Sequence, residues 1–165
     1  MCIRDSPKAV DRWLQWGYNR NQKGVITMNE ALKNIMSRRS VKAYKPEMPS
    51  QELIDQVVEA GTHAPTGMNR QSPIIIEVTD KAVRDKLSKM NADVMGAKID
   101  PFYGAPVVLV VLADKSVGTY KYDGSLVMEN LMLAANAVGL GSCWIHRAKE
   151  EFESEEGREL LRQLG

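Results

Sequence analysis

The residues of this chain that could do chemistry are concentrated in two short segments. The first, Arg38-Arg39-Ser40-Val41-Lys42, carries three cations and a hydroxyl directly after a short helical pattern. Guanidinium forks and hydroxyls are donors that proteins use to bind a dianionic phosphate. Taken alone, two adjacent arginines more often belong to a solvated turn. The segment therefore indicates a phosphate site only if the rest of the same ligand is recognised elsewhere in the chain.

A second segment could recognise that remainder: Ala64-Pro65-Thr66-Gly67-Met68-Asn69-Arg70-Gln71. It combines small residues with two side-chain amides, and an amide both donates and accepts hydrogen bonds, as recognition of a polar ring edge requires. Pro65-Thr66-Gly67 alone is typical of an ordinary turn, but Asn69 and Gln71 lie two apart just before an apolar strand pattern. A phosphorylated ring cofactor such as FMN needs both kinds of segment, so their presence in this order predicts a flavoprotein.

Composition narrows the class of protein. The 165 residues are 44% hydrophobic and 26% charged, as is ordinary for one soluble globular domain. Residues 1–27 hold five Lys/Arg and two Asp/Glu, and the remainder holds 17 and 19; a slightly acidic domain is a poor nucleic-acid binder. No apolar run approaches the roughly 20 residues of a membrane helix. The two cysteines, Cys2 and Cys143, make no disulfide framework, so we expect a cytoplasmic protein.

Residues 1–27 differ from the rest of the chain, and residues 28–165 form the predicted domain. The codons permitted by Lys23-Gly24-Val25 include a bacterial ribosome-binding sequence shortly before Met28. We therefore expect Met28 to be the natural start and residues 1–27 to be a non-native or disordered leader. The alternative is a genuine N-terminal helix over residues 10–18 that packs through Trp13 and Trp16.

The elements that must position the two segments alternate between helix and strand. Apolar spacing predicts helices over 29–37, from an N-cap at Ser50 to Gly61, from an N-cap at Asp80 through Met90, over 124–138, and from an N-cap at Ser154 to residue 164. Strands are predicted over 74–79, 107–112 and 142–146, the second of them central and buried on both faces. Helix 124–138 is apolar almost all round, which predicts burial from more than one side, in the middle of a domain or at a subunit interface.

The order of these pieces resembles the nitroreductase family of FMN-dependent oxidoreductases in its short bacterial form. Four stretches carry the resemblance: the two segments above, the helix from Asp123 with Asn130 and Leu131, and Gly139-Leu140-Gly141-Ser142-Cys143-Trp144-Ile145. The family implies an α+β fold, with a sheet flanked by helices around a long buried central helix, and a homodimer with FMN at its interface. Relatives continue past the last helix into a further strand, so we expect that strand to be missing here and the domain to be incomplete at its C-terminus.

The resemblance also implies residue roles. Arg38, Arg39, Ser40 and Lys42 would surround the phosphate or the nearby ring edge. A second group would lie beside the isoalloxazine, in relatives usually from the partner subunit: Thr66, Gly67, Met68, Asn69 and Gln71. Gly141 and Ser142 would offer backbone N–H groups towards the redox-active centre of the flavin. A hydride would pass from NAD(P)H through flavin N5 to a nitroaromatic, quinone or similar small acceptor.

No side chain is predicted to act as a catalytic nucleophile, acid or base, and no metal-ligand set is predicted. The alternative to an enzyme is a flavin-binding or interaction protein without turnover, including a non-functional fragment. Bound FMN that neither NADH nor NADPH can bleach would distinguish that alternative from a reductase.

Overall fold

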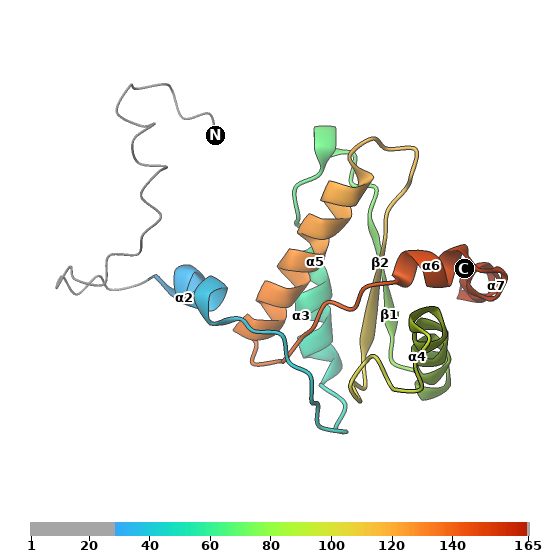
Figure 1. The fold of residues 1–165 in the computed structure, drawn as a ribbon. Helices are drawn as coiled ribbons and strands as arrows, with labels where there is room; N and C mark the ends of the chain where they lie inside the picture. Colours follow the sequence, from blue (N-terminus) through green and yellow to red (C-terminus); the bar gives the residue numbers. More distant parts are fainter. Residues whose placement is uncertain (1–28, 165) are drawn as a thin grey trace, which may run out of the picture.

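The fold was taken from a computed structural model, which describes residues 29–164. Two strands, β1 (Ile74–Val78) and β2 (Val108–Leu112), pair antiparallel with Ile76 opposite Val110. Helices α3 (Gln51–Thr62) and α5 (Tyr120–Ala137) cover one face of this sheet, whereas α4 (Lys81–Met95), α6 (Ala148–Glu153) and α7 (Glu155–Leu164) lie on the other (Figure 1). A short helix, α2 (Glu30–Ser37), packs on the outer side of α5. The predicted α+β class is confirmed. The prediction for residues 1–27 lies outside the described residues.

The sheet divides the interior into two hydrophobic cores because strand side chains alternate between its faces. On the α4 side, Ile76, Val78, Val108 and Val110 pack with Leu87, Met90, Phe102, Phe152 and Leu160. On the α3–α5 side, Ile75, Leu109 and Val111 pack with Val57, Ala64, Val127, Leu131 and Ala135. Both faces of the sheet are therefore covered within one chain.

Several sequence signals are confirmed at the residues that carry them. The Asp80 carboxylate accepts from the backbone N–H of Val83 at 2.9 Å, so it caps α4 as predicted. The Ser154 hydroxyl accepts from the N–H of Gly157 at 2.9 Å and begins α7 in the same way. Ser50 precedes α3 but makes no side-chain capping bond. Helix α4 extends to Met95 and ends at Gly96, whose φ of 69° suits glycine.

Three predictions of secondary structure are wrong. Residues 142–146 do not form a strand, because Ser142 makes one parallel bridge to Ser40 and no ladder continues from it. Strand β2 pairs only with β1 among the described residues, so the predicted central position is wrong, although both of its faces are packed as predicted. Gly61 does not end α3. It lies inside the helix, where a Cβ would be 2.6 Å from Leu131 Cδ2, so glycine serves close helix packing there. Helix α6 was not predicted.

Helix α5 is buried mainly on the side that faces α3 and the sheet, while the short helix α2 covers only the end of its outer side. Its inner side contributes Val127, Leu131 and Ala135 to the core, whereas Tyr122 is 73% and Leu126 43% exposed. One chain therefore does not bury this helix all round. Of the two alternatives, the middle of a domain or a subunit interface, the exposed apolar side chains favour the interface. Among the described residues, no helix is both long enough and apolar enough to cross a membrane.

Candidate functional site

The structure brings the cationic segment against the Gly141–Ser142 segment, from opposite ends of the sequence. The N–H of Val41 donates to the carbonyl oxygen of Ser142 at 2.9 Å, next to the bridge between Ser40 and Ser142. Gly141 lies directly under the Val41 side chain, and a Cβ on Gly141 would be 2.9 Å from Val41 Cγ2. A side chain at position 141 would therefore push the two segments apart. Two of the three predicted parts of the site are thus adjacent.

The cations of this segment are held in different ways. Arg38 is the C-cap of α2 and is half-buried. Arg39 folds back on that helix end, with Nη1 donating to the carbonyl oxygens of Met36 at 2.7 Å and Arg38 at 2.8 Å. A cation is favoured there because the C-terminal carbonyls of a helix carry partial negative charge. The Lys42 ammonium lies 5.8 Å from the ring centroid of Tyr103. Sequence reasoning missed both the helix-end contact of Arg39 and the Lys42–Tyr103 pair.

The amide segment forms a strained turn before β1. Met68, Asn69 and Gln71 have φ values of 53°, 54° and 48°, in the left-handed region that side chains disfavour. The N–H of Gln71 donates to the Thr66 hydroxyl at 2.9 Å, and Gln71 Nε2 donates to Asn69 Oδ1 at 3.3 Å. A backbone conformation of this kind costs of order 1 kcal/mol or more per residue, and such conformations are often found at ligand-binding sites. The two amides are held together on an exposed turn, with Met68 81% exposed beside them.

A buried carboxylate anchors this turn to the beginning of α5. Asp123 is 2% exposed; its Oδ1 accepts from the N–H of Gly67 at 3.0 Å and its Oδ2 from the Thr119 hydroxyl at 2.7 Å. Gly67 also touches Thr119 closely, since a Cβ at position 67 would lie 2.4 Å from Thr119 Oγ1. Sequence reasoning gave Asp123 no role. The available signal was a single acidic residue at the start of an otherwise apolar helix.

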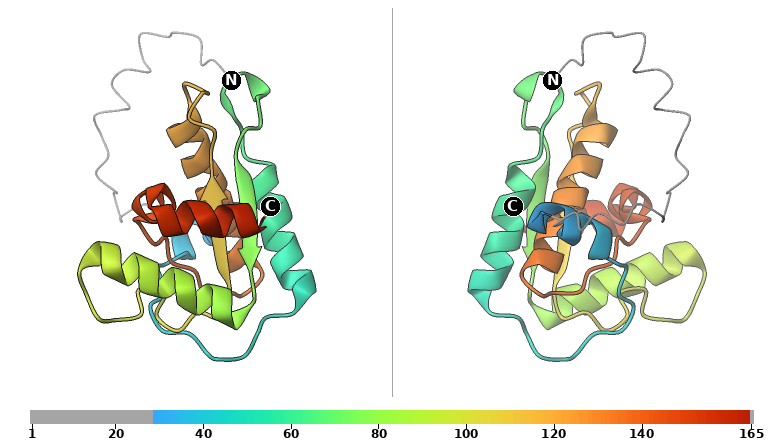
Figure 2. Two further views of the ribbon diagram at one scale, coloured as in Figure 1. Left: turned by 90° about the vertical axis from the view of Figure 1, so that its right-hand side faces the viewer. Right: turned by 90° about the vertical axis from the view of Figure 1, so that its left-hand side faces the viewer.

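The strained turn and the cationic segment lie at opposite ends of α5 within one chain. Thr119 and Asp123, which hold the turn, are at the beginning of the helix, whereas Gly139–Ser142 follows its end. Figures 1 and 2 show the turn η1 (Gly67–Asn69) at one end of the molecule and residues 40–49 at the other. An 18-residue helix is about 27 Å long. One chain alone therefore does not bring the predicted phosphate-binding and ring-binding residues together.

A cavity of about 770 Å³ lies beside the cationic segment, between residues 41–49, residues 139–145, α4 and the sheet. Its walls are mainly apolar, with polar groups at Tyr44, Asn91 and Glu151. Burial, followed by the nearby Cys143 and Tyr103, raises the pKa of Tyr44 to about 12; its hydroxyl donates to the carbonyl oxygen of Val41 at 2.8 Å. This volume is in the range of small-molecule sites in proteins.

Buried polar groups line the inner end of this cavity. Asn91 Nδ2 donates to Glu151 Oε2 at 2.6 Å and to the His146 carbonyl oxygen at 3.0 Å, while Arg147 Nε donates to Asn91 Oδ1 at 3.0 Å. Burial raises the pKa of Glu151, against the opposing effects of the Asn91 hydrogen bond and the Arg147 charge. The amide of Asn91 therefore joins helix α4 to the turn that precedes α6.

Comparison with known proteins identifies relatives of this chain. The model of the nitroreductase family matches residues 35–163. A protein of Archaeoglobus fulgidus, provisionally named an NADH dehydrogenase/NAD(P)H nitroreductase, is 34% identical over 139 residues, covering 81% of this chain and 77% of that protein. An FMN reductase [NAD(P)H] of Bacillus subtilis is 30% identical over 132 residues, covering 70% of this chain and 53% of that protein.

Solved structures agree with the sequence matches. The crystal structure of a nitroreductase with bound FMN from Desulfitobacterium hafniense superposes with a TM-score of 0.76 at 31% identity, covering 84% of this chain and 81% of that chain. A second nitroreductase with bound FMN, from Bacteroides fragilis, gives a TM-score of 0.78 at 26% identity over the same shares of the two chains.

Proposed function

This chain belongs to the nitroreductase family, and from that premise we propose that it is an FMN-dependent oxidoreductase. It takes a hydride from NAD(P)H and reduces a nitroaromatic, a quinone or a similar small acceptor. The meeting of the cationic segment with Gly141–Ser142 carries this proposal, because it places the phosphate donors directly beside the backbone that the resemblance assigns to the flavin. The related nitroreductases with bound FMN and the NAD(P)H-dependent names of the sequence relatives support it.

The cationic segment fits the phosphate end of FMN. Arg38, Arg39 and Lys42 lie within five residues of one another, and Ser40 adds a hydroxyl. Arg39 uses Nη1 for the end of α2 and keeps further N–H donors on its guanidinium group. Lys42 offers a compact charge rather than a planar fork, so it contributes attraction rather than bidentate geometry. This donor set suits a dianion better than any neutral ligand.

The strained turn fits the ring end. Asn69 and Gln71 present donors and acceptors, as the polar edge of a flavin requires. Two hydrogen bonds fix this turn: the Gln71 N–H donates to the Thr66 hydroxyl, and the Gly67 N–H donates to the Asp123 carboxylate. Met68, which is largely exposed, supplies an apolar surface beside the ring. These residues would therefore bind and orient the flavin, which would supply the redox chemistry between NAD(P)H and the acceptor.

A homodimer is the arrangement that lets both ends bind one FMN. The two parts of the site are separated along α5 in one chain, so a second chain has to supply one of them. The exposed apolar residues support this: α2 presents Leu32, Ile35 and Met36, each about half exposed, and α5 presents Tyr122 and Leu126. Exposed apolar surface on a globular domain is characteristic of interaction sites. We propose that these helix faces meet their copies in the partner.

Helix α2 is held in place for such a contact by amide groups. Asn34 Nδ2 donates to the Leu133 carbonyl oxygen at 2.8 Å, and Asn136 Nδ2 donates to Asn34 Oδ1 at 2.6 Å. These bonds turn the polar side of α2 towards α5 and leave its apolar side uncovered. A polar anchor under an exposed apolar face suits an interface between copies better than it suits an isolated chain.

An absorption spectrum tests the proposed function. The purified protein, supplied with FMN, is expected to be yellow, to lose its flavin absorbance with NADH or NADPH under anaerobic conditions, and to regain it with a quinone. Bound FMN that neither nucleotide bleaches would instead indicate a flavin-binding protein without turnover. A colourless protein that takes up no FMN would refute both readings.

A further inference from the structure

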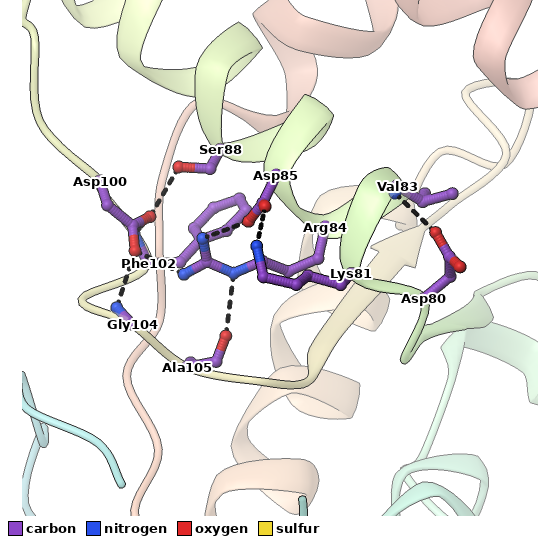
Figure 3. Close-up of polar contacts among 10 residues, drawn as sticks. All are labelled: Asp80, Lys81, Val83, Arg84, Asp85, Ser88, Asp100, Phe102, Gly104 and Ala105. Carbon is purple, nitrogen blue, oxygen red and sulfur yellow. Dashed lines mark hydrogen bonds and ion pairs between the residues drawn. The ribbon is translucent and has the colours of Figure 1, made fainter. Parts of the chain in front are cut away.

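The turn at residues 100–105 is held by an unusually complete set of hydrogen bonds. The Asp100 carboxylate accepts from the Ser88 hydroxyl at 2.6 Å, from Arg84 Nη2 at 2.5 Å, and from the N–H groups of Phe102 at 3.0 Å and Gly104 at 2.7 Å (Figure 3). Burial opposes ionisation, but these four donors outweigh it and lower the pKa of Asp100 to about 2. The carboxylate is therefore ionised throughout the physiological range.

Arg84 of helix α4 fixes the other side of the same turn. Its Nε donates to the Ala105 carbonyl oxygen at 2.9 Å, and its guanidinium lies 5.4 Å from the ring centroid of Phe102 (Figure 3). Arg84 is almost completely buried, so these contacts are shielded from water. Two buried side chains one helical turn apart, Arg84 and Ser88, thus bind the turn to α4.

The hydrogen bonds of Asp100 and Arg84, which together form a clamp on this turn, determine the position of Tyr103. Tyr103 has a φ of 53° and the following Gly104 a φ of 78°, so the backbone is forced into a left-handed pair between the two bonds to Asp100. The strain directs Tyr103 out of the turn, where it is 36% exposed. Its ring lies 5.8 Å from the Lys42 ammonium and is close enough to Tyr44 to raise the pKa of that phenol.

We propose that Tyr103 is a positioning residue that holds the Lys42 ammonium in the phosphate-binding cluster, with Asp100 and Arg84 as the clamp that sets it there. This inference rests on the proposed function, because it takes the ligand of the Lys42 cluster to be the phosphate of FMN. The face of an aromatic ring attracts a cation without using its N–H donors. A lysine held in this way loses fewer conformations when phosphate binds, since its long side chain is already partly ordered.

The test measures the affinity of the protein for FMN and for riboflavin, which lacks the phosphate. Tyr103→Leu is expected to weaken FMN binding about twofold to fivefold, the effect of one exposed cation–π contact, and to leave riboflavin binding unchanged. Tyr103→Phe, the matched control, keeps the ring face and is expected to bind both ligands as the wild type does. In a Lys42→Met background, Tyr103→Leu should have no further effect on FMN binding, because the pair it breaks is already lost.

The outcomes separate this inference from the function on which it rests. Equal FMN binding by the wild type and Tyr103→Leu overturns the role of Tyr103. Equal loss of FMN and riboflavin overturns it as well, since a general disturbance of the fold would act on both. The same holds if the loss persists undiminished in the Lys42→Met background. A wild-type protein that binds neither ligand overturns the proposed function itself, and this inference with it.

Discussion

Replacement of Asp123 by alanine tests whether the buried carboxylate holds the turn at residues 66–71, which we propose binds the flavin ring. In the structure, Asp123 is 2% exposed and accepts two hydrogen bonds, from the N–H of Gly67 at 3.0 Å and from the Thr119 hydroxyl at 2.7 Å. Asp123→Ala removes both acceptors and leaves the Gly67 N–H without a partner. Each lost hydrogen bond costs about 0.5–1.5 kcal/mol, and an unsatisfied buried donor about 1–3 kcal/mol. We expect the free energy of unfolding to fall by about 2–4 kcal/mol.

The same substitution should weaken the binding of both FMN and riboflavin. The turn carries Met68, Asn69 and Gln71 in strained conformations, and it relaxes once its anchor to α5 is lost. Urea unfolding followed by circular dichroism measures the stability, and flavin fluorescence quenching measures the two affinities. Asp123→Asn is the matched control: its amide oxygen can still accept from Gly67 and its Nδ2 can donate to the Thr119 hydroxyl.

The result that refutes this reasoning is a specific one. If Asp123→Ala is as stable as the wild type, the two hydrogen bonds do not hold the turn. If stability falls while the folded variant binds both flavins as tightly as before, the turn is anchored but does not contact the ring.

Arg38→Ala should distinguish the two flavins, unlike Asp123→Ala. Loss of a phosphate donor should weaken the binding of FMN and leave the binding of riboflavin unchanged.

Three further predictions concern stability. Gly61→Ala should lower the free energy of unfolding by about 1–3 kcal/mol in urea unfolding, because its Cβ would lie 2.6 Å from Leu131 Cδ2, whereas Gly118→Ala, with open space at its Cβ, should not. Asp100 has a folded pKa of about 2, below the ordinary 3.8, so its contribution should be present above about pH 4 and lost towards pH 2. Asp100→Asn should accordingly be less stable than the wild type at pH 7, by roughly 1 kcal/mol after solvent screening, and this difference should shrink as the pH falls towards 2. Glu151 has a raised pKa, so its ionisation opposes folding as the pH rises above 4.5; Glu151→Gln should raise the melting temperature at pH 7–8, and not at pH 4. A constant difference across that pH range would contradict the last prediction.

Local signals predicted the local parts of the fold well. The β-branched run at Ile74–Val78 and the capping residues Asp80 and Ser154 each act through neighbours within a few positions, so the sequence alone reveals them. The strand predicted at residues 142–146 fails for the opposite reason. Whether an extended segment becomes a strand depends on a partner edge, and here Ser142 finds only Ser40 across a single bridge.

The candidate site was predictable as a set of residue types and not as an arrangement. The cations, the amides and Gly141 were all visible in the sequence, but their supports are long-range. Asp123 reaches Gly67 across 56 positions, and no periodicity connects them. Tyr103 lies beside Lys42 on a turn that a hydrogen bond between Arg84 and Asp100 fixes to α4. Sequence patterns suggest which groups could bind a ligand, whereas the packing that orients these groups depends on contacts between distant elements.

Helix α5 connects the two parts of the candidate site. Its beginning holds the turn at residues 66–71 through Asp123, its end leads into Gly141 and Ser142 beside the cationic segment, and its outer side exposes Tyr122 and Leu126. In the proposed dimer, each FMN contacts the beginning of one copy of the helix and the end of the other. Flavin binding and dimer formation then stabilise one another, because a ligand that binds only the assembled state favours assembly. If the proposed dimer forms, the exposed apolar residues of α5 and the turn at residues 66–71 serve a single function, although the sequence separates them by about 50 positions.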